Sequence, residues 1–170
     1  MKKYSANGFT LMEVMITVVI IGILASIAYP SYTNYVTAAR RSDATINLTR
    51  IAAQQEKFFT ECGTYTSVFN GVISSPVPPR CTGLGMGTVA GSYDTTDGYY
   101  RLTVTNLVAG PPPLNRAGGG GYTLSAAPVA GTSQFAADNS KCTTLTITNT
   151  GAKGATGTDS GPNGGKCWKK

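Results

Sequence analysis

The feature that most constrains this chain is an apolar run from Phe9 to Tyr29, FTLMEVMITVVIIGILASIAY, which follows a short basic start. Its 21 residues are enough to cross the hydrocarbon core of a bilayer, for which a helix needs about 20 residues. Lys2 and Lys3 precede the run, so the positive-inside rule places the N-terminus in the cytoplasm and exports the chain beyond residue 30. The run therefore predicts a membrane helix joined to an exported part.

One acidic residue, Glu13, stands inside this apolar run. A carboxylate in hydrocarbon costs several kcal/mol unless it is paired or close to the interface, so such a residue is a candidate for a functional role. A secretory signal peptide cut near the small residues Ser26 and Ala28 is one alternative, and a plain single-span anchor is another. Neither alternative gives the carboxylate a purpose.

The segment from Gly8 to Val14, GFTLMEV, resembles the prepilin processing site of type IV pilins and related pseudopilins. In that family a prepilin peptidase cuts after the glycine and methylates the new N-terminal amine. The resemblance implies cleavage between Gly8 and Phe9, N-methylation of Phe9, and a role for Glu13 as the family's glutamate near the mature N-terminus. The short basic leader and the apolar run complete the motif.

Simple electrostatics supports the role that the resemblance gives to Glu13. Cleavage creates a cationic amine on Phe9 at the edge of an apolar helix, where an unpaired charge is costly and a pair is tolerable. Pairing of Glu13 with its own or a neighbouring subunit's amine can fix the register of a subunit that enters a filament. The implied partners are other pilin subunits, the prepilin peptidase and the inner-membrane assembly machinery. The expected locations are the inner membrane for the precursor and the surface filament for the mature chain.

The helix is expected to continue beyond the membrane. Gly22 and Pro30 interrupt its apolar part, and Pro30 lacks an N–H, so we expect a kink there. In residues 31–62 apolar side chains recur mostly every three or four positions, which indicates an amphipathic helix. The more solvent-exposed residues of this part are expected to be Arg40, Arg41, Asp43 and Arg50. At 1.5 Å per residue the whole helix would be about 80 Å long, so its first half must find lipid or other copies of itself.

After Gly63 the sequence changes to strand and turn patterns. Strands are expected at 98–105, 122–127 and 143–148, with separators that include residues 128–139. They suggest an antiparallel meander whose apolar face packs on the second half of the helix, an α+β fold. The expected segments are a leader (1–8), a membrane and filament-core helix (9–30), the amphipathic second half of the helix (31–62) and a sheet domain (63–170).

The exported part resembles the minor-pilin branch of type IV pilins, which includes the competence pilin that binds DNA during uptake. The matching segments are residues 40–66, Gly98-Tyr-Tyr, Tyr122-Thr-Leu, Cys142-Thr-Thr-Leu-Thr and Cys167-Trp. The resemblance implies a long kinked N-terminal helix on a small antiparallel sheet, and a structural pilus subunit that supports adhesion, twitching motility or DNA uptake. The alternatives are a DNA-receptor minor pilin and a pseudopilin of a type II secretion system.

Four cysteines in an exported domain indicate disulfides, and four cysteines allow three pairings. We favour the sequential pairing, Cys62 with Cys81 and Cys142 with Cys167. The second bond would match the disulfide-bounded loop that pilins carry near the C-terminus. The absence of a Cys-x-x-Cys motif argues against a zinc or redox site.

The charge of +6 falls to +4 once Lys2 and Lys3 leave with the leader. The C-terminal tail holds a modest basic cluster that could neutralise DNA phosphates, against the plainer interpretation of a solvated loop. Its lysines are Lys141, Lys153, Lys166, Lys169 and Lys170, and Arg80, Arg101 and Arg116 could extend it. The chain has no His and no evident catalytic pair, so we expect neither an enzyme nor a cofactor or metal site. Asp138 and Asp159 are too sparse for the calcium site of many pseudopilins.

Overall fold

The structure is a computed structural model that describes residues 9–71, 81–87, 91–108 and 120–168. The chain divides into two compact units, Met1–Val36 and Thr37–Lys170. The leader with Gly8, the arginines Arg80 and Arg116, and the last two lysines, Lys169 and Lys170, lie outside the described residues.

Helix α1 (Leu11–Cys62) has 52 residues and takes part in both units. It runs through Gly22 and Pro30 without a break in its helical assignment, and the expected kink stays a prediction. The helix ends where Gly63 takes a positive φ of 68° and donates its N–H to the carbonyl of Phe59 at 2.7 Å. A glycine in the left-handed region is a common helix stop because it has no Cβ to clash.

The second unit holds a five-stranded antiparallel sheet with the strand order β1-β2-β3-β4-β5. The strands are β1 (Tyr93–Asp94), β2 (Tyr100–Val108), β3 (Gly121–Pro128), β4 (Thr144–Thr148) and β5 (Lys153–Thr156). This order is a meander, so the expected antiparallel arrangement is confirmed. Strands β2, β3 and β4 match the expected ones, whereas β1 and β5 are additional to them.

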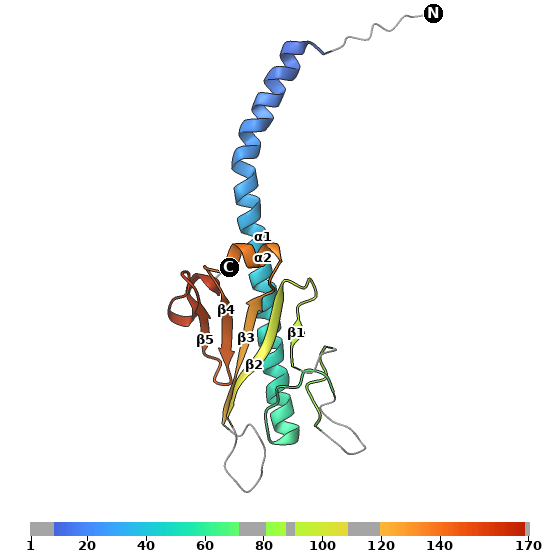
Figure 1. Ribbon diagram of the computed structural model, residues 1–170, viewed down its shortest axis with the longest axis vertical. Coiled ribbons are helices and arrows are strands. Elements are labelled where there is room, and N and C mark those ends of the chain that lie inside the picture. Colours follow the sequence, from blue (N-terminus) through green and yellow to red (C-terminus); the bar gives the residue numbers. More distant parts are fainter. Residues whose placement is uncertain (1–8, 72–80, 88–90, 109–119, 169–170) are drawn as a thin grey trace, which may run out of the picture. The chain divides into compact units, whose positions relative to one another are not determined.

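The part of α1 that belongs to the second unit packs on one face of this sheet (Figure 1). Its buried residues recur every three or four positions, as an amphipathic helix requires. They are Ala44, Asn47, Leu48, Ile51, Gln55, Phe58 and Cys62. The opposing core side chains come from alternate positions of β2, β3 and β4, namely Tyr100, Leu102, Tyr122, Leu124, Ala126, Leu145 and Ile147. The α+β class, a helix on a small antiparallel sheet, is thereby confirmed.

Two short helices complete the fold, α2 (Ser133–Asp138) and η1 (Pro162–Cys167). Thr132 caps α2, because its side chain accepts the N–H of Phe135. The segment 128–139 is therefore more than a separator between strands. Disulfides join Cys62 to Cys81 and Cys142 to Cys167, which is the sequential pairing, and the described cysteines include no free thiol.

Candidate functional site

The first candidate site is the N-terminal turn of α1 in the first unit. Phe9 is 82% exposed, and Glu13 lies in the first helical turn. The hydroxyl of Thr10 accepts the N–H of Glu13 at 3.3 Å, and the hydroxyl of Thr17 donates to its carbonyl at 2.6 Å. These bonds occupy only the backbone of Glu13. Within the described residues its carboxylate has no hydrogen-bond or ion-pair partner, so it is available to a charge from outside this segment.

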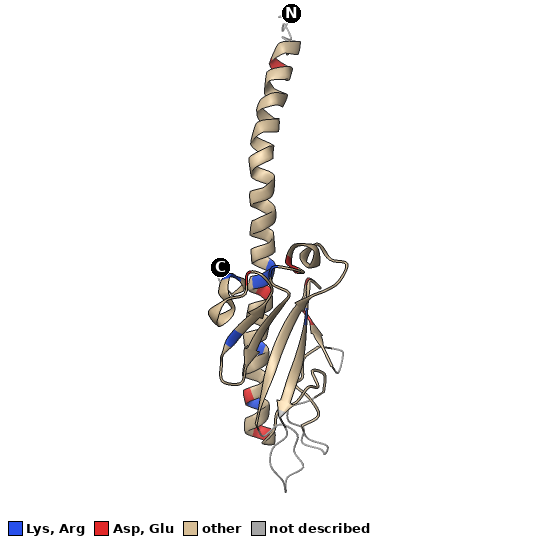
Figure 2. Cartoon of the chain, turned by 60° about the vertical axis from the view of Figure 1, so that its left-hand side comes forward, with Lys and Arg blue, Asp and Glu red and all other residues tan. Residues whose placement is uncertain are grey.

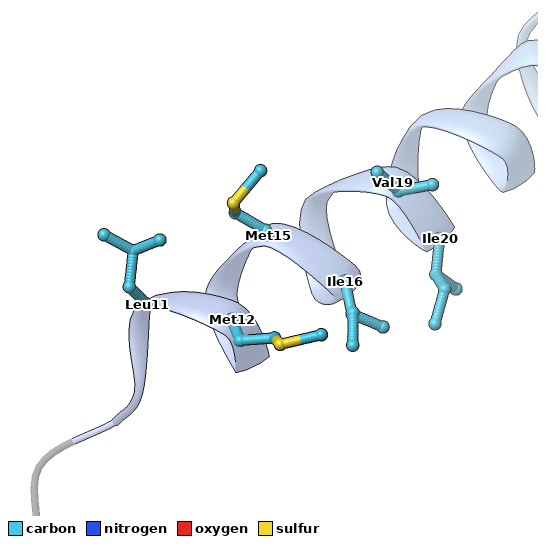
Figure 3. Close-up of a pocket in the computed structure, with 6 residues that line it drawn as sticks. All are labelled: Leu11, Met12, Met15, Ile16, Val19 and Ile20. Atoms are coloured by element: carbon cyan, nitrogen blue, oxygen red, sulfur yellow. The ribbon is translucent and has the colours of Figure 1, made fainter.

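An apolar surface surrounds this carboxylate. Figure 2 shows a single acidic position near the start of α1, followed by a long stretch without charge. Figure 3 shows apolar side chains that line an open hollow of about 440 Å³ along this turn: Leu11, Met12, Met15, Ile16, Val19 and Ile20. Each is at least 51% exposed, and α1 is long and apolar enough to cross a membrane. Such a surface needs lipid or another apolar helix to cover it.

Gly22 and Pro30, the expected helix breakers, both lie inside α1. A Cβ at Gly22 would meet no atom within 4 Å, so the surroundings of Gly22 within the chain leave room for a larger residue. The hydroxyl of Thr33 donates to the carbonyl of Pro30 at 3.0 Å. The glycine is therefore not required by packing inside the subunit, and its role as a helix break stays a prediction.

The second candidate site is the basic cluster near the C-terminus, which the Cys142–Cys167 disulfide organises. Lys141 and Lys166 each precede one of these cysteines, whose Cα atoms are 5.7 Å apart. Asp159 links the two segments through its backbone, since it donates to the carbonyl of Lys141 at 2.9 Å and accepts from the N–H of Lys166 at 3.1 Å. The fold thus brings together two of the predicted lysines that are 25 residues apart in sequence.

Lys153, the third described lysine of this basic cluster, makes a cation–π contact with Trp168, the residue directly after Cys167. Its Nζ lies 5.1 Å from the centroid of the Trp168 ring, and the indole N–H of Trp168 donates to the carbonyl of Gly154 at 2.7 Å. A Cβ at Gly164 would come within 1.9 Å of Trp168 Cδ1, so only glycine fits beneath the ring. Lys141, Lys153 and Lys166 are all exposed, which makes their ammonium groups available to an anion.

A shallow hollow of about 270 Å³ adjoins Lys166. Its lining is polar and consists of Thr158, Asp159, Ser160, Gly161, Gly165 and Lys166. One carboxylate is too few to hold a hard cation, which takes six or more oxygen ligands in the case of calcium. Across the described part of the chain, no group of three or more His, Cys, Asp or Glu residues is placed to hold a metal ion.

A buried polar network centred on Asp138 was not predicted from the sequence. This aspartate has no exposed surface, and its carboxylate accepts from Tyr100 Oη at 2.7 Å and from Gln134 Nε2 at 2.6 Å. Arg41 Nε donates to its two oxygens at 3.0 and 2.9 Å, and Arg41 Nη2 donates to Oδ1. The prediction that Arg41 is one of the more solvent-exposed residues is wrong, since its side chain is 16% exposed and faces this carboxylate.

The network shifts the proton affinities of its members. Burial, together with the hydrogen bond to Asp138, raises the pKa of the Tyr100 phenol well above its usual value. The hydrogen bond from Arg41 to Asp138 raises the pKa of the Arg41 guanidinium despite partial burial. Arg40, by contrast, donates to Tyr99 Oη at 2.8 Å, and its Cζ lies over the Tyr99 ring, 3.6 Å from the ring centroid. The arginine pair therefore ties α1 to α2 and to Tyr99, the residue directly before β2.

Comparison with known proteins adds to these observations. Residues 30–146 match a family model described as "Type IV minor pilin ComP, DNA uptake sequence receptor". Residues 3–29 match a second model, the prokaryotic N-terminal methylation motif.

The curated relatives resemble this chain over only part of their own length. The chain is 37% identical to the type IV major pilin protein PilA of Myxococcus xanthus over 85 residues, which cover 50% of this chain and 39% of that protein. It is 52% identical to the fimbrial protein EcpC of Eikenella corrodens over 44 residues, 26% of this chain and 29% of that protein. The matches therefore span well under two thirds of these relatives.

Among solved structures, a type IV pilin from Shewanella oneidensis is similar, with 20% identity and a TM-score of 0.37. The match covers 69% of this chain and 89% of the solved chain.

Proposed function

The chain belongs to the family of the type IV minor pilin ComP, the DNA uptake sequence receptor, and from this premise we propose that it is a structural subunit of a type IV pilus. The observation that carries the proposal is the isolated carboxylate of Glu13 on an otherwise apolar, exposed helix surface. A soluble subunit has no use for such a surface, whereas a filament of packed helices covers it.

In this proposal the precursor first lies in the inner membrane with its N-terminus in the cytoplasm. The prepilin peptidase cuts between Gly8 and Phe9 and methylates the amine of Phe9, in keeping with the matched methylation motif. The apolar helix stays with the mature chain, first as an anchor and then as a packing element. Glu13 neutralises the amine of a neighbouring subunit and so sets the register of assembly. Pilin family members are structural, and no catalytic role is proposed.

Intact-mass measurement of the chain purified from membranes tests the processing step. The expected mass is that of residues 9–170 with one additional methyl group on Phe9. Replacement of Gly8 by a bulky residue should leave the full-length mass, because the peptidase site is then blocked. A mature chain that begins at Tyr29 would instead indicate a signal peptide and would contradict the proposed anchor.

A second function, reception of DNA, is favoured by the exposed lysines beside the Cys142–Cys167 disulfide. Lys141, Lys153 and Lys166 are suited to neutralise phosphates, and counterion release makes such binding strongly dependent on salt. The family description supports DNA as the ligand. The pseudopilin alternative lacks a comparable supporting observation, because the polar hollow near Lys166 offers a single carboxylate.

Titration of labelled duplex DNA with the full chain in detergent micelles tests this second function. The Lys141→Gln/Lys166→Gln variant should bind more weakly on all sequences, and its log–log salt slope should be smaller by about 2, because two phosphates are no longer neutralised. Lys57→Gln removes a lysine from an exposed position of α1 and serves as the matched control. Equal affinity and salt slope for the double variant and the wild type would exclude this cluster as the DNA site.

A further inference from the structure

The first turn of α1 has its own capping residue, Thr10. Phe9 and Thr10 are not helical, and α1 begins at Leu11 (Figure 3). The carbonyl of Thr10 accepts the N–H of Val14 at 3.3 Å, which is the first bond of the helical ladder, and its hydroxyl accepts the N–H of Glu13 at 3.3 Å. A residue that precedes the helix and makes both bonds is an N-cap. Thr10 therefore sets the position at which α1 begins.

The cap also fixes where Glu13 lies in the helix. Counted from Thr10 as the N-cap, Glu13 is the third residue of α1, and Thr-x-x-Glu is the sequence of a capping box. The start of a helix carries a partial positive charge, whose effect falls off within the first turn. The carboxylate of Glu13 therefore stands at a position where its own helix stabilises it before any amine is available.

The sequence before Thr10 contains a competing start for the helix. Asn7 lies three positions before Thr10, and asparagine caps helices at least as well as threonine. A helix that began after Asn7 would include Gly8 and Phe9 in its first turn, and it would move Glu13 out of that turn. Gly8 opposes such a helix, because glycine loses more conformational freedom than any other residue. The cap at Thr10 adds to this opposition.

The position of the helix start matters because the bond to be cut lies just before it. We propose that Thr10 is a positioning residue for leader cleavage, which rests on the proposed processing: its cap keeps the peptide bond between Gly8 and Phe9 outside the helix. In the reaction a water molecule adds across this bond, Gly8 keeps the new carboxylate and Phe9 leaves with the amine. A peptide unit inside a helix is engaged in the ladder, so a peptidase reaches it only after local unfolding.

Cleavage of the full chain in membranes by the prepilin peptidase, followed over time by intact mass, tests the proposal. Thr10→Val keeps the β-branched shape and removes the hydroxyl, and its initial cleavage rate should fall about fivefold, the usual factor for loss of an N-cap. Thr10→Ser should be cut like the wild type. Thr17→Val is the matched control, because it removes a hydroxyl that bonds to the carbonyl of Glu13 but does not cap the helix, and it should not change the rate.

Two further measurements separate capping from direct recognition of the Thr10 hydroxyl by the peptidase. Thr10→Asn has no hydroxyl but is a good cap, so it should be cut at the rate of the wild type. The Cα chemical shift of Phe9, measured by NMR on the full chain in detergent micelles, should move toward helical values in Thr10→Val and stay unchanged in Thr10→Asn. A contact between the hydroxyl and the peptidase would not move this shift.

The outcomes of these measurements are distinguishable. Cleavage of Thr10→Val at the rate of the wild type would overturn the role of the cap and leave the proposed processing intact. Cleavage of Thr10→Asn as slow as that of Thr10→Val would also overturn it, since the hydroxyl itself would then be recognised. No cleavage of the wild type would contradict the processing step, and the role of Thr10 in that step with it.

Discussion

Replacement of Asp138 by Ala is expected to lower the free energy of unfolding of the sheet domain by about 3–5 kcal/mol, the usual cost of breaking a buried ion pair from one side. The carboxylate is fully buried and accepts hydrogen bonds from Arg41, Tyr100 and Gln134. Its removal leaves the guanidinium of Arg41 and the hydroxyl of Tyr100 without their acceptor, and it takes away one of the acceptors of Gln134. It also removes a contact that joins α1, β2 and α2.

Urea unfolding, monitored by the fluorescence of the single tryptophan, measures this loss. Trp168 bonds to Gly154 on β5 and therefore reports on the domain itself. Asp94→Ala is the matched control, since it removes an aspartate that pairs with Arg101 where both side chains are about half exposed. Exposed pairs contribute little because water screens them, so the control should lose much less stability. Equal losses in the two variants would show that the Asp138 network does not hold the domain.

The main features of this fold could be predicted because they come from long, periodic patterns. The apolar run and the amphipathic pattern predicted α1 to within one residue of its end at Cys62. Strand β4 was predicted almost to its bounds, because Leu145 and Ile147 alternate with threonines. In each case local sequence and tertiary packing favour the same structure.

Elements that depend on tertiary partners could not be predicted in this way. Strand β5 reads KGAT, which has no apolar alternation, and it forms because β4 pairs with it. Helix α2 is only six residues long, and its polar residues Gln134 and Asp138 point inward to Arg41 and Tyr100. Inward polar residues reverse the usual hydrophobic pattern, so periodicity alone could not assign this segment. The capping threonine, Thr132, was its one local signal.

The candidate sites also differ in how much of each could be predicted from the sequence alone. The sequence pointed to Glu13 because one charge in an apolar run is conspicuous without any knowledge of the fold. It also pointed to the tail lysines, but their grouping depends on the Cys142–Cys167 bond and on the Lys153–Trp168 contact. The rows of threonines across the sheet could not be predicted without the strand register, since residues from three separate segments become neighbours only in the sheet.

Replacement of Glu13 by Ala is expected to remove the chain from pili while its amount in the membrane stays unchanged. The helix keeps its apolar surface, so insertion does not depend on the carboxylate. In the filament, however, the methylated amine of Phe9 would lie among apolar helices without its counter-charge. A buried charge that loses its partner costs about 3–5 kcal/mol, which reduces incorporation by a factor of roughly 100 to 5,000 per subunit.

The measurement is the amount of this chain in sheared filaments relative to its amount in the membrane fraction. Glu61→Ala makes the same change at an exposed position of the same helix and should leave that ratio unaltered. Glu13→Gln keeps the size and removes only the charge, so it should fail in assembly almost as completely as Glu13→Ala. Normal incorporation of Glu13→Gln would mean that shape or hydrogen bonding, and not charge neutralisation, sets the register. Normal incorporation of Glu13→Ala would remove the assembly role of this carboxylate altogether.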